Sequence, residues 1–286
     1  MTGRPAPSLI ESAAEGSGGL LIVGLAHSGK TEVRRIIDTS PRVFSARRAR
    51  HWNAVGDRWH DLDERACLSL VSADDSLASW EASVEAAVDA WRTLAHPRIA
   101  ALLALAYHMR ASASQADLWC AQVSGIESQV PALLAELPGL RVIHTLRDPR
   151  TGLGVSRRSG VAGRRGWDLA AWHRSARVAK HAGERFSDRY RVVRWDDLVS
   201  DPDEVVASLG RFLGRDLELP EEWAPDQKPI GTGITGDRAI RQVSGLLTDL
   251  GFPARAPGSS GTGMVADLID LLGFRIRSMR PGVGQW

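Results

Sequence analysis

Apolar residues gather in short runs along the chain, and each run is followed by residues with helical spacing. The first run, residues 20–23, is typical of a buried strand, and Val33, Ile36 and Ile37 then mark one face of a helix over residues 31–38. Three more strands are predicted, over residues 118–123, 141–146 and 190–195. Helices are predicted around them, over residues 76–94, 97–110, 131–137, 167–186, 201–213 and 240–250.

The alternation of strands and helices predicts an α/β fold with a parallel central sheet and helices on both of its faces. Residues 1–18 are rich in Gly, Ser, Pro and Ala and are predicted to be a flexible tail. Residues 19–286 are predicted to form a single domain with helical insertions. Within it, residues 42–65 are expected to be an irregular loop, and the part from about residue 215 to be irregular and helical.

The turn between the first strand and the first helix carries the clearest chemical signal. Gly24 is followed by four residues and then by Gly29, Lys30 and Thr31, which satisfies the P-loop pattern. Backbone N–H groups at a helix start lack intrahelical partners and attract anions, and glycines let the chain approach an oxyanion closely. The turn therefore predicts a phosphate-binding site. An ordinary strand-to-helix turn with a surface lysine is the alternative.

Composition excludes several other classes of protein. The chain has 286 residues, of which 43% are hydrophobic, and its formal net charge of +2 says little about its partners. A nucleic-acid partner is not expected, because no nucleic-acid-binding motif is present. Residues 141–185 hold eleven Arg or Lys and three Asp or Glu, which suits a polyanionic small ligand. Cys67 and Cys120 have no metal-ligand spacing, and we find neither a signal peptide nor a membrane span, so a cytoplasmic protein is expected. The excess of Arg and Ala over Lys suggests a bacterial source.

Two further landmarks follow the P-loop-like turn in a set order. Residues 141–150 read Arg-Val-Ile-His-Thr-Leu-Arg-Asp-Pro-Arg, and Ser156 lies downstream of them. Residues 196–202 read Asp-Asp-Leu-Val-Ser-Asp-Pro and lead into a segment that ends Phe-Leu-Gly. Together with the turn, this order resembles the sulfotransferases that use 3′-phosphoadenosine 5′-phosphosulfate (PAPS). The resemblance covers residues 20–214, with gaps.

The resemblance implies a P-loop-containing α/β fold, PAPS as the sulfuryl donor, no metal and a small-molecule acceptor. It implies that Arg147 and Ser156 bind the 3′-phosphate of the donor. It also implies that the turn holds the 5′-phosphosulfate, through His27, Ser28, Gly29, Lys30 and Thr31. In the usual family pattern a lysine or an arginine precedes Ser-Gly. This turn departs from that pattern, because His27 precedes Ser28-Gly29 and the basic residue, Lys30, follows them. Gln122 stands where the family often has a lysine.

The predicted reaction transfers a sulfuryl group in line to a hydroxyl or an amine, with Lys30 at the bridging or sulfuryl oxygens. Such an acceptor needs a base, and His51 lies in the loop where the family often places one. Glu32 and His27 are the rival bases. A P-loop ATP-dependent kinase or NTPase and a non-catalytic nucleotide-binding relative are the alternative functions. Neither a nucleic-acid nor a membrane partner is expected, and the oligomeric state stays open.

Overall fold

The computed structural model describes residues 9–46, 49, 51–54, 65–66, 69, 80–95, 98–151, 169–224 and 237–252. Ser156 lies outside these residues, as do most of the predicted loop over residues 42–65 and the chain after Phe252. The family landmarks other than Ser156 are all described.

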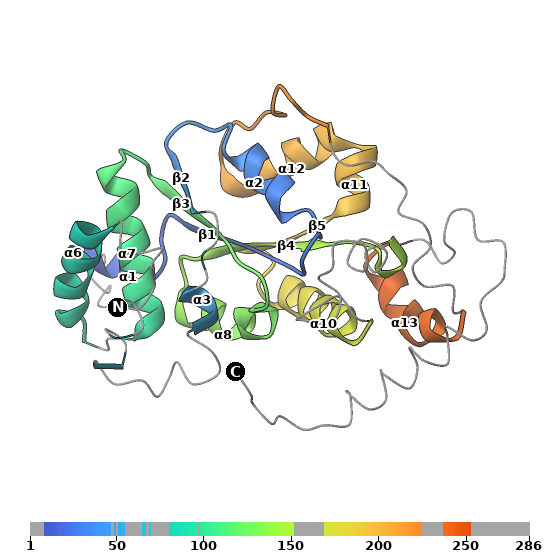
Figure 1. Ribbon diagram of the computed structural model, residues 1–286, viewed down its shortest axis with the longest axis horizontal. Helices are drawn as coiled ribbons and strands as arrows, with labels where there is room; N and C mark the ends of the chain where they lie inside the picture. The colour runs from blue at the N-terminus through green and yellow to red at the C-terminus, as the bar shows by residue number, and fades with distance from the viewer. Residues whose placement is uncertain are drawn as a thin grey trace, which may run out of the picture.

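Five parallel strands form the sheet at the centre of the molecule (Figure 1). They are β1 (Gly19–Val23), β2 (Val43–Ala46), β3 (Leu118–Gln122), β4 (Arg141–Leu146) and β5 (Tyr190–Arg194), in the spatial order β2-β3-β1-β4-β5. Leu21 lies opposite Ala121 of β3 and Val142 of β4, so β1 is flanked on both sides. Because all strands run the same way, their carboxyl ends share one edge, where the loop after β1 also lies.

Alternate side chains of β1 enter different cores. Leu20 and Ile22 pack with α2 (Lys30–Ile37), α11 (Trp195–Ser200) and α12 (Pro202–Leu213). Leu21 and Val23 pack on the other face, against α7 (Ile99–Ala113) and α8 (Val130–Glu136). Figure 1 shows α2, α11 and α12 above the sheet and α3 (His51–Ala54), α8 and α10 (Leu169–Arg185) below it. These layers confirm the predicted fold class.

The remaining helices extend the sandwich at its two ends. Helix α6 (Glu81–Arg92) packs beside α7, and α13 (Asp237–Asp249) packs against α10. The short helix η1 (Glu127–Gln129) leads into α8. No helix in the described part of the chain combines the length and the apolar character needed to cross a membrane.

Two segments differ from the sequence-based expectation. Part of the predicted tail forms α1 (Leu9–Ala14), because Ala13 and Ala14 bury their small side chains in the core that contains α7. Parts of the predicted loop form β2 and the short helix α3, and the residues of β2 are only half-buried and pair with β3 at the edge of the sheet. Neither segment has a strong local pattern, so its structure depends on contacts with distant residues.

A fully buried histidine joins the sheet to α10. His144 on β4 has its Nδ1 2.5 Å from the Tyr190 hydroxyl and its Nε2 2.8 Å from Oγ of Ser175. Burial, with a smaller contribution from the charge of Lys30, lowers the pKa of His144 to about 3. The imidazole is therefore neutral in the fold, where one ring nitrogen donates a hydrogen bond and the other accepts one.

We expect His144 to make the stability of the fold depend on pH. The unfolded chain takes up a proton near pH 6.5 and the folded chain only near pH 3, so this contribution is complete above pH 6.5 and declines as the pH falls towards 3. Between pH 7 and pH 5 it removes about 2 kcal/mol from the free energy of unfolding. Urea unfolding of the wild type and of His144→Gln at both pH values measures the difference. The exposed His181→Gln serves as control, and an equal pH dependence in all three proteins contradicts the assignment.

Candidate functional site

The loop between β1 and α2 requires glycine at two positions. Gly24 has a φ of 139° and Gly29 a φ of 101°, both in the region that side chains disfavour. A Cβ on Gly24 would lie 2.4 Å from the Thr145 carbonyl oxygen, and one on Gly29 would lie 2.8 Å from the Trp195 ring. The loop is thus pressed against β4 on one side and α11 on the other, with the first turn of α2 at its end.

Lys30 folds back into this loop. Its Nζ donates hydrogen bonds to the carbonyl oxygens of Gly24, at 2.6 Å, and Leu25, at 2.5 Å, and the residue is only 4% exposed. Burial lowers the pKa of Lys30 to about 8, although the carboxylates of Glu127 and Glu32 oppose the shift. The loop therefore encloses a cation whose partners are neutral carbonyls, a charge that a bound anion would balance.

Ser28 connects the loop to the neighbouring strand. Its hydroxyl lies 2.8 Å from the Leu25 carbonyl oxygen and 2.5 Å from Oγ1 of Thr145 on β4, and the residue is buried. Thr31, at the start of α2, is exposed, and its Oγ1 accepts a hydrogen bond of 3.3 Å from Nε2 of Gln122 at the end of β3. The loop is thereby held by the two strands that flank β1.

Arg147 brings a second cation to the loop from the end of β4. It donates a 3.3 Å hydrogen bond to the His27 carbonyl oxygen, and its guanidinium lies 4.8 Å from the centre of the Trp195 ring. His27 has a positive φ of 60°. Burial, followed by the charges of Lys30 and Arg147, lowers the pKa of the His27 imidazole. The structure thus brings together the predicted loop residues and Arg147, which are 120 positions apart in the chain.

The segment after Arg147 is fixed by a buried ion pair. Arg150 donates from Nε to both carboxylate oxygens of Asp148 and from NH2 to Oδ2 at 2.5 Å, and both side chains are 4% exposed. The Asp148 backbone N–H donates to Oδ2 of Asp196 at 3.4 Å. Burial and the nearby Asp148 charge raise the pKa of Asp196. This pairing stabilises the turn from which Arg147 points.

The predicted bases occupy different environments. Glu32 is half-buried in the first turn of α2, and its charge acts on both His27 and Lys30. His51, in α3, is 4% exposed, and its Nε2 lies 2.8 Å from the Tyr107 hydroxyl in a cluster of aromatic rings. Asn53 of the same helix donates to the Ser124 carbonyl oxygen at 2.6 Å, just after β3, which places α3 at the carboxyl edge of the sheet.

Sequence reasoning missed one carboxylate, Glu127 of η1. Its side chain is buried, it accepts a 3.4 Å hydrogen bond from the Gly125 N–H, and its charge favours the protonated form of Lys30. The available signal was its place in the turn after β3, because ligand sites in parallel sheets lie beyond the carboxyl ends of the strands. Nothing in the residues around it distinguishes it from a surface glutamate.

The chain was compared with known proteins. A model of the family described as "Sulfotransferase family" matches residues 19–219, which include the loop after β1, Arg147 and the candidate bases. A search of curated proteins gives no match.

Solved structures of three sulfotransferases resemble the chain. A sulfotransferase domain from the Synechococcus PCC 7002 olefin synthase is 20% identical, with 90% of this chain and 94% of that chain covered and a TM-score of 0.49. A sulfotransferase domain from the curacin biosynthetic pathway is 17% identical, covers 78% and 79% of the two chains, and has a TM-score of 0.45. Sulfotransferase STF1 from Mycobacterium tuberculosis H37Rv is 16% identical, covers 72% and 69%, and has a TM-score of 0.41.

Proposed function

Because the chain belongs to the sulfotransferase family, and is thus an enzyme that transfers sulfuryl groups, we propose that its donor is PAPS and that its acceptor is a small molecule with a hydroxyl or an amine. The observation that carries the proposal is the meeting of Lys30 and Arg147 at one loop, where Arg147 bonds the His27 carbonyl oxygen. PAPS has negative charge at two separate places, and two cations on neighbouring segments match that distribution. We also propose a bacterial, cytoplasmic enzyme that needs no metal.

The loop fits the 5′-phosphosulfate of such a donor. The absence of a Cβ at Gly24 and Gly29 leaves the backbone close to its neighbours, and the N–H groups at the start of α2 are turned to an anion by the helix geometry. We assign Ser28, Gly29 and Thr31 to this contact, with His27 at its rim. PAPS supplies the sulfuryl group, and the chain supplies binding, orientation and positive charge.

Lys30 has the central role in this proposal. Its ammonium now bonds the carbonyls of Gly24 and Leu25, and a sulfuryl or bridging oxygen offers it a charged partner in their place. Negative charge grows on the bridging oxygen as the transferred group leaves, so an ammonium held there stabilises the transition state more than the ground state. The carboxylate of Glu127 keeps Lys30 protonated while no anion is bound.

Arg147 and Ser156 are assigned to the 3′-phosphate. Trp195 lies under the Arg147 guanidinium, and the His27 carbonyl oxygen takes one of its N–H groups, so the side chain is already oriented. The NTPase alternative is less well supported, because Asp148, the carboxylate that follows β4, is engaged by Arg150 on both oxygens. A carboxylate so paired is a poor ligand for the magnesium ion that NTPases need.

We assign the general base to His51 or Glu32, because the third candidate, His27, is assigned to the rim of the phosphosulfate site. His51 is already hydrogen-bonded to a phenol, which orients its ring, and its helix lies at the carboxyl edge of the sheet. Glu32 lies directly after the loop in the chain, and its charge favours the protonated forms of His27 and Lys30. Either group would take the proton of the acceptor as the sulfuryl group arrives.

Replacing Lys30 by Ala is expected to lower the rate of sulfuryl transfer by ~10²–10³, because an ammonium at the leaving oxygen is lost. Turnover of radiolabelled PAPS with a panel of hydroxyl and amine acceptors measures it. Lys180→Ala, which removes an exposed lysine paired with Asp249, is the matched control and should keep the wild-type rate. A Lys30→Ala enzyme with the full rate contradicts the role of the loop, and no turnover of PAPS by the wild type contradicts the donor.

The 3′-phosphate assignment predicts that 3′,5′-bisphosphoadenosine (PAP) binds more tightly than AMP. A charge-assisted contact contributes roughly 1.5–3 kcal/mol, so calorimetry should give about 10- to 150-fold between the two nucleotides. Arg147→Met should bring their affinities together, whereas Arg185→Met, a change on the exposed side of α10, should leave the ratio as it is. Equal affinities of PAP and AMP for the wild type would refute the role of Arg147.

The base is identified by pH–rate profiles of His51→Gln and Glu32→Gln at saturating PAPS. The variant that lacks the base should lose ~10²–10⁴ in rate together with the acidic limb of the profile. Glutamine preserves a hydrogen-bonding group next to Tyr107, so the His51 variant tests proton transfer more than packing. If both variants keep the wild-type limb, neither residue is the base.

A further inference from the structure

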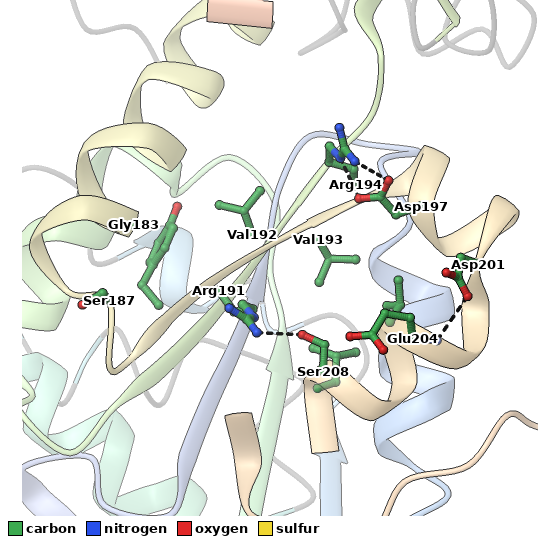
Figure 2. Close-up of a pocket in the computed structure, with 13 residues that line it drawn as sticks. Gly183, Ser187, Arg191, Val192, Val193, Arg194, Asp197, Asp201, Glu204 and Ser208 are labelled. Carbon is green, nitrogen blue, oxygen red and sulfur yellow. Dashed lines mark hydrogen bonds and ion pairs between the residues drawn. The ribbon is translucent and has the colours of Figure 1, made fainter. Parts of the chain in front are cut away.

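The groove along β5 shows how carboxylates are used at the surface of this structure. It has a volume of about 560 Å³ and lies between the end of α10 and α12. Figure 2 shows Arg194 bonded to Asp197, and Asp201 accepting a backbone hydrogen bond from Glu204 as the cap of α12. Glu204 in turn pairs with Arg211. The carboxylates of the groove are thus already engaged and leave no negative charge for another role.

Glu127 of η1 is a carboxylate of a different kind. The residue is buried, and within the described residues its carboxylate accepts a 3.4 Å hydrogen bond from the Gly125 N–H and forms no ion pair. Helix η1 packs against α10, on the face of the sheet to which Tyr190 also belongs. Burial, followed by the charge of Glu127, raises the pKa of Tyr190. A buried carboxylate without a bonded cation is costly, so its charge is compensated from a distance.

The buried cation that compensates Glu127 is Lys30. The Val123 N–H donates to the Ile22 carbonyl oxygen at 2.9 Å, so the chain that leads from β3 to η1 starts beside the end of β1 and its loop. The charge of Glu127 is the largest influence that favours the protonated form of Lys30, ahead of that of Glu32. Since no ion pair joins these two described side chains, ammonium and carboxylate act on each other through the protein interior, where charges are weakly screened.

The charge of Lys30 is held only in part. The ammonium is buried against two neutral carbonyls, and burial lowers the pKa of Lys30 to about 8 in spite of the carboxylates. In the empty site about nine-tenths of the molecules are therefore protonated here at pH 7, and about one-tenth at pH 9. An anion at the loop raises this pKa again, because it adds negative charge beside the ammonium. The affinity for the anion is then complete below pH 8 and declines as the pH rises above it.

On the basis of the function proposed above, which places the donor at this loop, we propose that Glu127 is a positioning residue that holds the proton on Lys30 in the empty site and that the donor takes over this role. Binding of the donor above pH 8 is thereby coupled to the uptake of one proton, which passes from the solvent to Nζ of Lys30. Glu127 acts through Lys30 and does not touch the donor. Without its charge, the loop becomes neutral at a lower pH.

The other charged groups near Lys30 do not obscure this coupling. They come from each element around the loop and are His27, Glu32 of α2, Glu127 of η1, His144 of β4 and Arg147. Burial lowers the pKa of His27 and brings that of His144 to about 3, and a guanidinium stays charged throughout. The phosphates of a nucleotide lose their second proton near pH 6. Within the described part of the site, Lys30 is therefore the group that titrates between pH 7.5 and 9.

Carbon-13 NMR of the full-length protein, labelled at lysine Cε, measures the titration of Lys30 directly. The chain has three lysines, so the signals are few, and Lys180, whose pKa the hydrogen bond to Asp249 raises, is the internal reference. In the empty wild type Lys30 should titrate near pH 8. Glutamine at position 127 keeps the shape but removes the charge, so Glu127→Gln should lower this midpoint by about one pH unit.

Two control variants separate the charge of Glu127 from its packing. Glu127→Asp retains the carboxylate and should keep the Lys30 midpoint close to that of the wild type. Glu184→Gln removes an exposed carboxylate of α10 and should leave the midpoint unchanged.

Calorimetry with PAP tests the coupling itself. The wild type should bind PAP about tenfold more weakly at pH 9 than at pH 7, and should take up about half a proton per nucleotide at pH 8, which buffers of different ionisation enthalpy reveal. Lys30→Arg stays charged over this range, so its affinity for PAP should not depend on pH. Inorganic pyrophosphate, an anion without a nucleoside, is the second ligand, and both ligands should raise the Lys30 midpoint in the NMR titration.

Two outcomes would overturn the proposal. One is a Lys30 midpoint that is the same in Glu127→Gln and in the wild type, since Glu127 then has no effect on the proton. The other is a Lys30 titration that neither PAP nor pyrophosphate moves, since anion binding is then not coupled to it. If pyrophosphate moves the midpoint and PAP does not, the coupling holds, and the assignment of PAPS as the donor fails instead.

Discussion

The buried ammonium of Lys30 constrains the shape of the loop between β1 and α2. A cation at 4% exposure needs oxygen partners, and the loop provides two carbonyls only because it curls tightly around the side chain. That curl requires the positive φ values of Gly24 and Gly29 and the close approach of β4 and α11. The packing of the sheet, the loop shape and the charge of the site are thus parts of one arrangement.

Two cations, Lys30 and Arg147, lie at the loop, and their positive charge favours an anionic ligand. Lys30 and Arg147 both donate hydrogen bonds to neutral backbone carbonyls of the loop. The nearest paired carboxylate, Asp148, is already neutralised by Arg150. The carboxylate charge of Glu127 favours the protonated form of Lys30. A phosphate or sulfuryl group supplies the missing negative charge.

The two edge strands of the sheet, β2 and β5, have different surroundings. The β2 edge is short and half-buried and leads into the aromatic cluster around His51. The β5 edge is bordered by helices on both faces but has an open groove along its backbone.

The sequence by itself determined the parts of this protein whose causes are local. The apolar runs of β1 and β4 and the Asp201 cap of α12 depend on residues close in sequence, so these structures can be predicted from the sequence alone. The order of the landmarks likewise identified the family and placed Arg147 near the loop.

Only the tertiary structure decided the features that depend on distant residues. The strand β2 and the helix α1 exist because β3 and α7 cover them, and neither has a periodic pattern of its own. The charge of Glu127 acts on Lys30, which is 97 positions earlier in the chain, and His51 packs against Tyr107 and Trp80. Burial and electrostatic interaction are properties of neighbours in space, and for these residues the neighbours in space are remote in sequence.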